Sequence, residues 1–122
     1  MNISPAESAV MEVLWRKHPQ SAEDIVAALQ GKRSWQVPTI KTLLNRLLKK
    51  GAITATKIGR YYLYEPCVER DDYLFTESSG VIDRLFGGRV APLVAHFSEH
   101  RKLSKKDFDE LKRLIEEIEH GR

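Results

Sequence analysis

The 122-residue sequence predicts a mainly α-helical protein with one small β-hairpin. The first observation is that apolar residues recur at helical spacing in six separate segments, most of which begin at a Ser or Pro and end at a Gly or Pro. The second is that residues 52–65 are rich in Ile, Thr, Tyr and Leu and contain a central glycine, which is typical of two short strands joined by a turn. Charged residues make up 30% of the chain and hydrophobic residues 42%, which is ordinary for a globular protein.

The most informative segment is residues 35–51, WQVPTIKTLLNRLLKKG. It predicts one amphipathic helix, because Pro38 suits the first helical turn and Gly51 suits the left-handed position after the last. Aliphatic residues from Ile40 to Leu48 follow the spacing i, i+3, i+4, i+7, i+8 and form a single apolar stripe. The opposite side carries polar and basic residues. This combination is typical of a helix that reads DNA, although an ordinary surface helix with a solvated face would look similar.

The segments on either side place this helix in a known arrangement. Ser4 and Glu7 have the spacing of a capping box for a first helix that ends near His18-Pro19, and Ser21 is positioned to cap a second helix over 22–30. Strands are expected at 52–57 and 60–65, with Ile58-Gly59 as the turn. Three helices followed by a hairpin predict a winged helix-turn-helix domain over residues 1–68, in which the third helix enters the major groove of DNA.

The charge distribution supports a polyanionic partner. Residues 1–66 hold ten basic and five acidic side chains, whereas residues 67–122 hold ten basic and twelve acidic ones. No acidic residue occurs between Asp24 and Glu65. A long basic stretch without acids is the electrostatic pattern of a nucleic-acid-binding surface, although chance clustering would also produce it.

The third helix and the hairpin supply the candidate DNA contacts. Four residues of the helix are expected to approach base edges, since Asn pairs well with adenine and Arg with guanine: Lys41, Thr42, Asn45 and Arg46. Five more are expected to hold phosphates: Thr39, Lys49, Lys50, Lys57 and Arg60. The alternative is a winged-helix module in which the third helix packs on another protein.

Residues 69–122 predict a helical dimerisation domain. A helix is expected over 70–86, ended by Gly87-Gly88, followed by a short helix over 90–97 and a last one capped by Ser104. Three such helices have too few apolar residues to form a core of their own. This favours packing against a second copy of the chain, and the alternative is packing against the winged-helix domain of the same chain. The expected interface comprises Leu85, Phe86, Leu93, Val94, Phe97, Phe108, Leu111, Ile115 and Ile118.

The sequence gives little support for an enzyme. No glycine-rich phosphate loop stands between a strand and a helix, and the single cysteine, Cys67, excludes an internal disulfide. His96, Glu99 and His100 are the only metal candidate, but they lack the HExxH spacing, so we expect no metal and no cofactor. The sequence contains no apolar run of membrane-spanning length and no visible secretory signal, and we expect a cytoplasmic protein without direct membrane binding.

Four stretches together resemble the BlaI/MecI family of penicillinase repressors: ISPAESAVMEVLW at 3–15, the pattern W-x-x-x-T-I-x-T-L-x-x-R-L-x-K-K-G at 35–51, the hairpin GRYYLYEP at 59–66, and LVAHFSEHRKLSKKDFDEL at 93–111. The resemblance implies a homodimeric transcriptional repressor that binds a palindromic operator in double-stranded DNA. It also implies control of β-lactamase or other antibiotic-response genes. A repressor of the same family that answers a different signal is the alternative.

The same resemblance implies how repression ends. Members of this family are cleaved at an Asn-Phe bond after a membrane-bound sensor metalloprotease detects a β-lactam, and the matching bond here is His96-Phe97. This sequence has His where the family has Asn. It also has Gln36-Val37-Pro38 where the family often has Ser-Pro-Lys, so we expect no side-chain cap on the third helix and a different operator preference.

Overall fold

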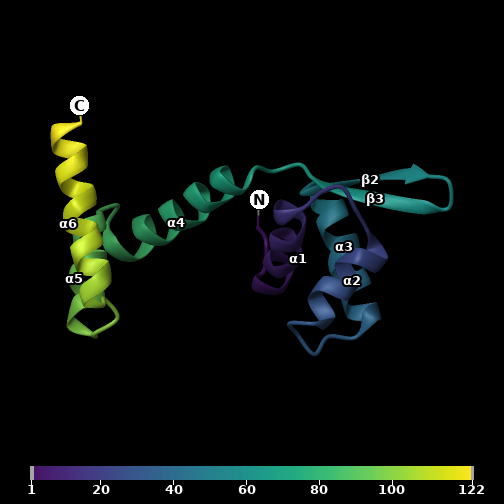
Figure 1. The fold of residues 1–122 in the computed structure, drawn as a ribbon, viewed down its shortest axis with the longest axis horizontal. Coiled ribbons are helices and arrows are strands. Elements are labelled where there is room, and N and C mark those ends of the chain that lie inside the picture. Colours follow the sequence, from purple (N-terminus) through teal and green to yellow (C-terminus); the bar gives the residue numbers. More distant parts are fainter. Residues whose placement is uncertain (1, 122) are drawn as a thin grey trace. The chain divides into compact units, whose positions relative to one another are not determined.

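A computed structural model of the chain describes residues 2–121 (Figure 1). The chain divides into two compact units, Met1–Leu74 and Phe75–Arg122. The elements, in order, are α1 (Pro5–Arg16), β1 (Gln20–Ser21), α2 (Ala22–Gln30), α3 (Val37–Lys50), β2 (Ile53–Ile58), β3 (Tyr61–Pro66), α4 (Arg70–Phe86), α5 (Val90–Glu99) and α6 (Lys105–His120). The predicted fold class, mainly helical with a small β-sheet wing, is confirmed.

Local capping signals set the helix boundaries where the sequence places them. The Ser4 hydroxyl accepts a hydrogen bond from the Glu7 backbone N–H, and the Glu7 carboxylate accepts one from the Ser4 N–H, which completes the predicted capping box. The Ser21 hydroxyl caps α2 in the same way. Helix α3 ends at Gly51, whose φ of 76° lies in the left-handed region that glycine occupies without strain. Gln36 makes no side-chain cap at the start of α3, as expected.

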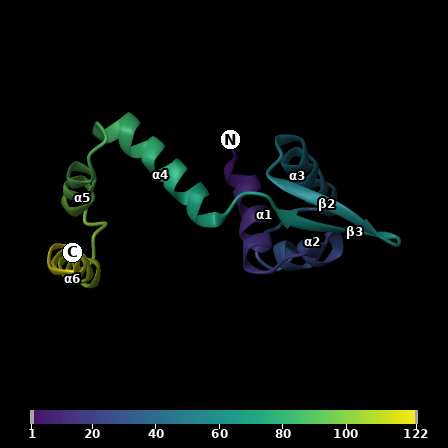
Figure 2. The ribbon, with the colours of Figure 1, turned by 90° about the horizontal axis from the view of Figure 1, so that it is seen from above.

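The sheet differs from the prediction in two respects. It has three antiparallel strands in the order β1-β3-β2, and the two-residue β1 was not expected. The hairpin turn is one residue later than predicted, because Ile58 pairs with Tyr61 and leaves Gly59-Arg60 as the loop. Gly59 has a φ of 63°, which a two-residue hairpin turn requires. Both views show the β2–β3 hairpin projecting beyond the three helices (Figure 1 and Figure 2).

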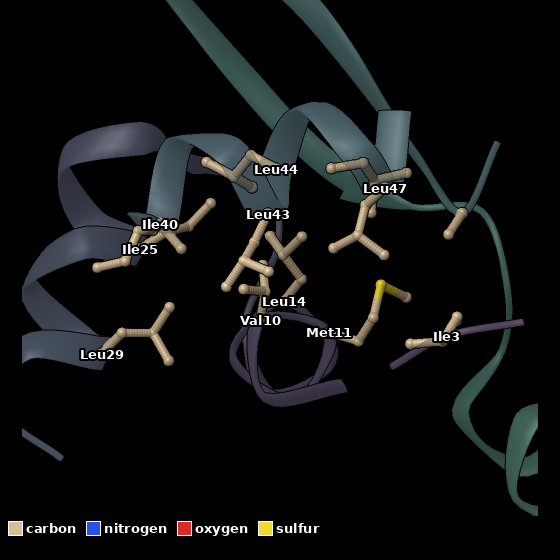
Figure 3. Packing of buried hydrophobic residues seen from close by; sticks show 12 residues of the cluster. Ile3, Val10, Met11, Leu14, Ile25, Leu29, Ile40, Leu43, Leu44 and Leu47 are labelled. Atoms are coloured by element: carbon tan, nitrogen blue, oxygen red, sulfur yellow. The ribbon is translucent and has the colours of Figure 1, made fainter. Parts of the chain in front are cut away.

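One hydrophobic core holds the first unit together. It is built from the inner faces of α1, α2 and α3 and the start of β2, as Figure 3 shows. Its buried members are Ile3, Val10, Met11, Leu14, Ile25, Leu29, Ile40, Leu43, Leu44, Leu47, Ala52 and Ile53. Both tryptophans, Trp15 and Trp35, are partly buried against this cluster. Four leucine and isoleucine residues of α3 are in the core, so its orientation is fixed by burial.

The first turn of α4 is attached to α1. The Trp15 indole N–H donates to the Val68 carbonyl oxygen at 2.7 Å, and its ring lies 5.3 Å from that of Tyr73. The Arg70 guanidinium pairs with the Glu12 carboxylate at 3.2 Å. The domain boundary predicted from the sequence lies between residues 68 and 69, and the compact units of the structure divide within α4, after Leu74.

The second unit has a different character. Helix α4 is continuous through Ser78-Ser79-Gly80, and Gly87-Gly88 ends it with positive φ at both glycines. The Ser104 hydroxyl accepts a hydrogen bond from the Asp107 N–H at the start of α6, as predicted. In the described residues, none of α4, α5 and α6 contains a fully buried side chain. None of the helices between residues 2 and 121 has the length and apolar character needed to cross a membrane.

Candidate nucleic-acid interface

Helix α3 presents the predicted base-contacting face to solvent. Lys41, Thr42, Asn45 and Arg46 are exposed, while the aliphatic stripe on the other side of the helix is in the core. Because burial fixes the rotation of α3 about its axis, these four side chains cannot turn inward. The Thr42 hydroxyl donates to the Pro38 carbonyl oxygen at 2.9 Å, so its methyl group and oxygen lone pairs are what remain available to a ligand.

A hollow on the surface of the first unit joins α3 to the hairpin. Its volume is about 270 Å³, and it is lined by residues of α2, α3, β3 and the hairpin loop, among them Lys41, Asn45 and Arg60. Two of the predicted base-contacting residues therefore share one concave surface with a predicted phosphate-binding residue. The sequence spacing does not show that residue 60 lies near residues 41 and 45. The packing of the antiparallel hairpin beside α3 places them around the same hollow.

Tyrosines form much of the wall of this hollow, and sequence reasoning did not assign them to the site. Tyr61, Tyr62 and Tyr64 line it, all from β3. Burial raises the pKa of the Tyr64 phenol above its ordinary value, and the charges of Tyr62 and Glu23 act in the same direction. Tyr64 is therefore a neutral hydrogen-bond donor at physiological pH.

Glu23 is a second residue that the sequence analysis missed. It lies at the start of α2, next to the Asp24 that precedes the acid-free stretch, and lines the hollow together with Lys41 and Arg60. It also lines the neighbouring groove between α2 and α3. An exposed carboxylate among cations repels phosphate and accepts hydrogen bonds from an amino group such as cytosine N4. The packing of α2 beside α3 and β3 places Glu23 at this hollow, and no pattern in the sequence indicated it.

The basic residues predicted to contact DNA are free of internal ion pairs within the described residues, with one exception. Within residues 2–121, no ion pair involves Lys41, Arg46, Lys49, Lys57 or Arg60. All five are exposed, as is Thr39. Unpaired, exposed cations suit phosphate contacts because no internal partner has to be displaced.

Lys50 is the exception, because its ammonium group already has partners within the fold. Its ammonium group donates to the Glu7 carboxylate at 2.6 Å and to the Asn2 carbonyl oxygen at 2.7 Å. Successive residues of a helix point about 100° apart. Lys50 therefore points toward α1, whereas its neighbour Lys49 remains free. The sequence contained no signal for this pairing, because Glu7 is separated from Lys50 by most of the domain.

The Glu7 carboxylate is unusually buried for a charged group, with 1% of the residue exposed. Burial raises the pKa of this group, but the hydrogen bonds from Lys50 and from the Ser4 N–H and hydroxyl outweigh that effect, so the pKa lies below its ordinary value. Its second oxygen, Oε2, is buried and accepts no hydrogen bond from the described residues. Glu7 thus depends on Lys50 and Ser4 to remain charged inside the fold.

The loop before α3 adds a further cation. The Arg33 guanidinium lies over the Trp35 ring, 4.9 Å from its centroid. Stacking of this kind limits the freedom of an arginine side chain while leaving its N–H donors exposed. Arg33 belongs to the acid-free basic stretch, although the sequence analysis gave it no individual contact.

The residues predicted to form a dimer interface lie in the second unit and are incompletely covered. Leu85, Phe97, Phe108, Ile115 and Ile118 are exposed, with exposed fractions between 44% and 63%. The remaining four, Phe86, Leu93, Val94 and Leu111, are partly buried. Phe97 and His96, the two residues of the candidate cleavage bond, are both exposed in the last turn of α5. Cys67 is exposed and free.

Comparison with known proteins identifies the family. The family model described as penicillinase repressor matches residues 3–117. The chain belongs to the penicillinase repressor family. The penicillinase repressor of Bacillus licheniformis is 34% identical over 115 residues, covering 94% of this chain and 90% of that protein. The methicillin resistance regulatory protein MecI of Staphylococcus aureus (strain N315) is 34% identical over 113 residues, covering 93% and 92% respectively.

Solved structures of penicillinase repressors match the first unit. The solution structure of the DNA-binding domain of the repressor BlaI is 38% identical with a TM-score of 0.55, covering 59% of this chain and 88% of that one. The monomeric form of BlaI from Bacillus licheniformis, solved in complex with the blaP half-operator, is 37% identical with a TM-score of 0.54, covering 60% and 89%. Penicillinase repressors are DNA-binding transcription regulators without enzymatic activity, and this chain is one of them. The predicted resemblance is thereby confirmed.

Proposed function

We propose that this repressor binds a palindromic operator as a homodimer, with α3 in the major groove and the β2–β3 hairpin at the adjacent phosphate backbone. The observation that carries the proposal is the hollow in which Lys41 and Asn45 of α3 meet Arg60 of the hairpin. A base-reading helix and a phosphate-binding loop that share one concave surface can contact a single duplex at the same time. A relative of known structure was solved with a half-operator.

Within this interface the residues have different roles. Lys41, Thr42, Asn45 and Arg46 approach base edges, and each good bidentate contact contributes about 1–3 kcal/mol of discrimination between bases. Thr39, Lys49, Lys57 and Arg60 contact phosphates and set the register. Lys50 is left out of the interface because of its pairing with Glu7.

The experiment is fluorescence anisotropy of the full chain on DNA from upstream of its own gene and on a scrambled duplex, at several salt concentrations. Arg46→Ala should reduce the ratio of the two affinities roughly 5- to 150-fold, the equivalent of about 1–3 kcal/mol. Lys57→Ala should weaken both duplexes alike and lower the salt slope by about 1. If Arg46→Ala leaves the ratio unchanged, the assigned face of α3 is wrong. Weak, equal binding to both duplexes would favour the alternative of a protein-interaction module.

The dimer is inferred from the second unit. None of the three helices has a buried side chain within the described residues, and Phe108, Ile115 and Ile118 of α6 are all more than half exposed. In a monomer this apolar surface would face water. A second copy of the same chain matches the two-fold symmetry of a palindrome. Sedimentation equilibrium should give a dimer for the native chain, and Ile115→Asp should shift it toward the monomer. The matched control Glu116→Asp, on the same helix, should leave the dimer intact.

We infer that repression ends by cleavage of the His96-Phe97 bond, triggered by a membrane-bound sensor metalloprotease, and that the regulated genes answer β-lactams. Relatives of this chain are named for penicillinase and methicillin resistance. A protease needs its substrate extended, so the last turn of α5, which holds this bond, must unwind first. We place the protein in the cytoplasm, where operator DNA is found in bacteria.

Cells that express the repressor should yield a fragment ending at His96 within minutes of β-lactam addition, detected by mass spectrometry. Phe97→Pro should block cleavage, because proline disfavours attack at the bond before it. Release of the operator without any such fragment would mean that this member of the family answers a different signal.

A further inference from the structure

We propose that His96 of α5 and His100, the residue that caps its C-terminus, form a two-histidine binding site for a divalent late transition-metal ion, Cu²⁺ or Ni²⁺. With Glu99 these residues do not match the HExxH spacing, so the sequence alone did not predict a metal site here. The structure brings the two imidazoles together, with ring centroids 4.5 Å apart and an angle of 53° between the ring planes. Histidines separated by four positions on a helix share one face, which is the arrangement that chelates a metal ion.

The ring separation agrees with the chemistry of these ions. Two imidazoles bound at right angles to one ion through metal–nitrogen bonds of about 2.0 Å would have their centroids roughly 4.5 Å apart, and a tetrahedral angle would need roughly 5 Å. Square-planar or tetragonal coordination by nitrogen is typical of Cu²⁺ and Ni²⁺. Copper also stands above nickel and zinc in affinity for a given set of nitrogen ligands.

The surroundings of the pair favour a cation. His96 is in the last turn of α5 and His100 is its C-cap, at the negative end of the helix dipole. The ring of Phe86 lies 6.1 Å from that of His96, and the ring of Phe97 lies 6.0 Å from it, so aromatic side chains stand beside one of the two ligands. Both histidines are exposed, so an ion reaches them without unfolding.

The site offers two protein ligands and open positions for water. No group of three or more His, Cys, Asp or Glu side chains in residues 2–121 is arranged to hold a metal ion, which distinguishes this pair from a closed structural site. Of the other histidines, His18 uses its Nδ1 in a contact of 2.9 Å with the Leu14 carbonyl oxygen. His120, at the end of α6, has no neighbouring histidine on its helix and provides a control.

The test is isothermal titration of the untagged full chain with CuCl₂ and with NiCl₂, in a buffer that does not coordinate metals, at pH 7.5. His96→Gln and His100→Gln each retain a polar side chain of similar size and should weaken binding at least tenfold. His120→Gln should change it less than twofold. Circular dichroism of each variant checks that the helices are retained.

A second measurement reports where the ion sits. An ion bound to both histidines closes a ring that contains residue 97, so chymotrypsin should cut after Phe97 several-fold more slowly with Ni²⁺ present. Cleavage after Phe75, which is 73% exposed, gives the internal control for protease activity. The protection should disappear in His100→Gln.

Equal binding by the native chain and the two variants, or equal loss in His120→Gln, would overturn the proposal and mean adventitious surface binding only. Unchanged cleavage after Phe97 in the presence of saturating metal would also overturn it. Neither measurement depends on DNA or on a cognate protease, so the outcome is independent of the proposed operator binding and of the proposed cleavage in cells.

Discussion

Replacing Lys50 with Met should destabilise the first unit while leaving DNA binding largely intact. The substitution removes two hydrogen bonds of the ammonium group, at 2.6 Å to Glu7 and 2.7 Å to Asn2. The Glu7 carboxylate would then have 2% of its side chain exposed, and hydrogen bonds from Ser4 would be what still stabilises its charge. Such a carboxylate would be a buried charge without a cation.

The magnitude follows from the burial of the two partners. Removing one member of a fully buried pair costs about 3–5 kcal/mol. The Lys50 side chain is 36% exposed, so water replaces part of its contribution and the expected loss is smaller, about 2 kcal/mol. With a urea dependence of about 2 kcal/mol per molar, the unfolding midpoint should fall by about 1 M.

Tryptophan fluorescence during urea unfolding of the full chain provides the assay. Both tryptophans of the chain, Trp15 and Trp35, pack against the core of the first unit, so their signal reports on this unit alone. Lys49→Met is the matched control, because Lys49 is exposed and forms no ion pair with residues 2–121. It should leave the midpoint within about 0.2 M and lower the salt slope of DNA binding by about 1. Equal midpoints for the two variants would refute the assignment of Lys50 to the fold.

Three further substitutions test other parts of the first unit. Folding lowers the pKa of Glu7, so the ionised carboxylate stabilises the fold at neutral pH and this stabilisation is lost as pH falls below about 4.5. The urea midpoint of Glu7→Gln should therefore change less between about pH 5 and pH 3 than the midpoint of the native chain. Trp15→Phe removes the 2.7 Å hydrogen bond to the Val68 carbonyl and should lower the free energy of unfolding by about 1 kcal/mol, measured by thermal unfolding followed by circular dichroism. Gly51→Ala should cost about 1 kcal/mol in the same assay, because φ is 76° at this position and an added Cβ meets no atom within 4 Å, so the cost is backbone strain alone. Unchanged stability in Gly51→Ala would argue against this strain.

The parts of the fold that the sequence predicted correctly depend on local interactions. The bounds of α2 and α4 agree with the predicted 22–30 and 70–86, because capping residues and glycines act within one turn of where they stand. The apolar stripe of α3 was equally predictable, since helical periodicity alone shows which side is buried. The exposure of Arg46 follows directly from it.

The parts that were missed depend on contacts between distant residues. Strand β1 has only two residues, and its identity comes from pairing with Leu63 and Tyr64 of β3. The packing of separate helices likewise pairs Lys50 with Glu7 and places Glu23 at the hollow. Sequence spacing within one element carries no information about such pairs, and without an aligned set of relatives nothing else in the sequence reveals them.

The location of the core has a consequence for how the chain is made. Every residue of the buried cluster falls between Ile3 and Ile53, and the partly buried residues packed against it extend only to Tyr73. A chain emerging from the ribosome can therefore complete this core while the residues after 74 are still being synthesised. In the proposed dimer, the apolar faces of α5 and α6 would be synthesised last and would be covered only afterwards, at a rate that rises with the concentration of the second copy. Folding of the first unit can therefore follow translation, whereas the proposed dimerisation of the second unit requires two finished chains to meet.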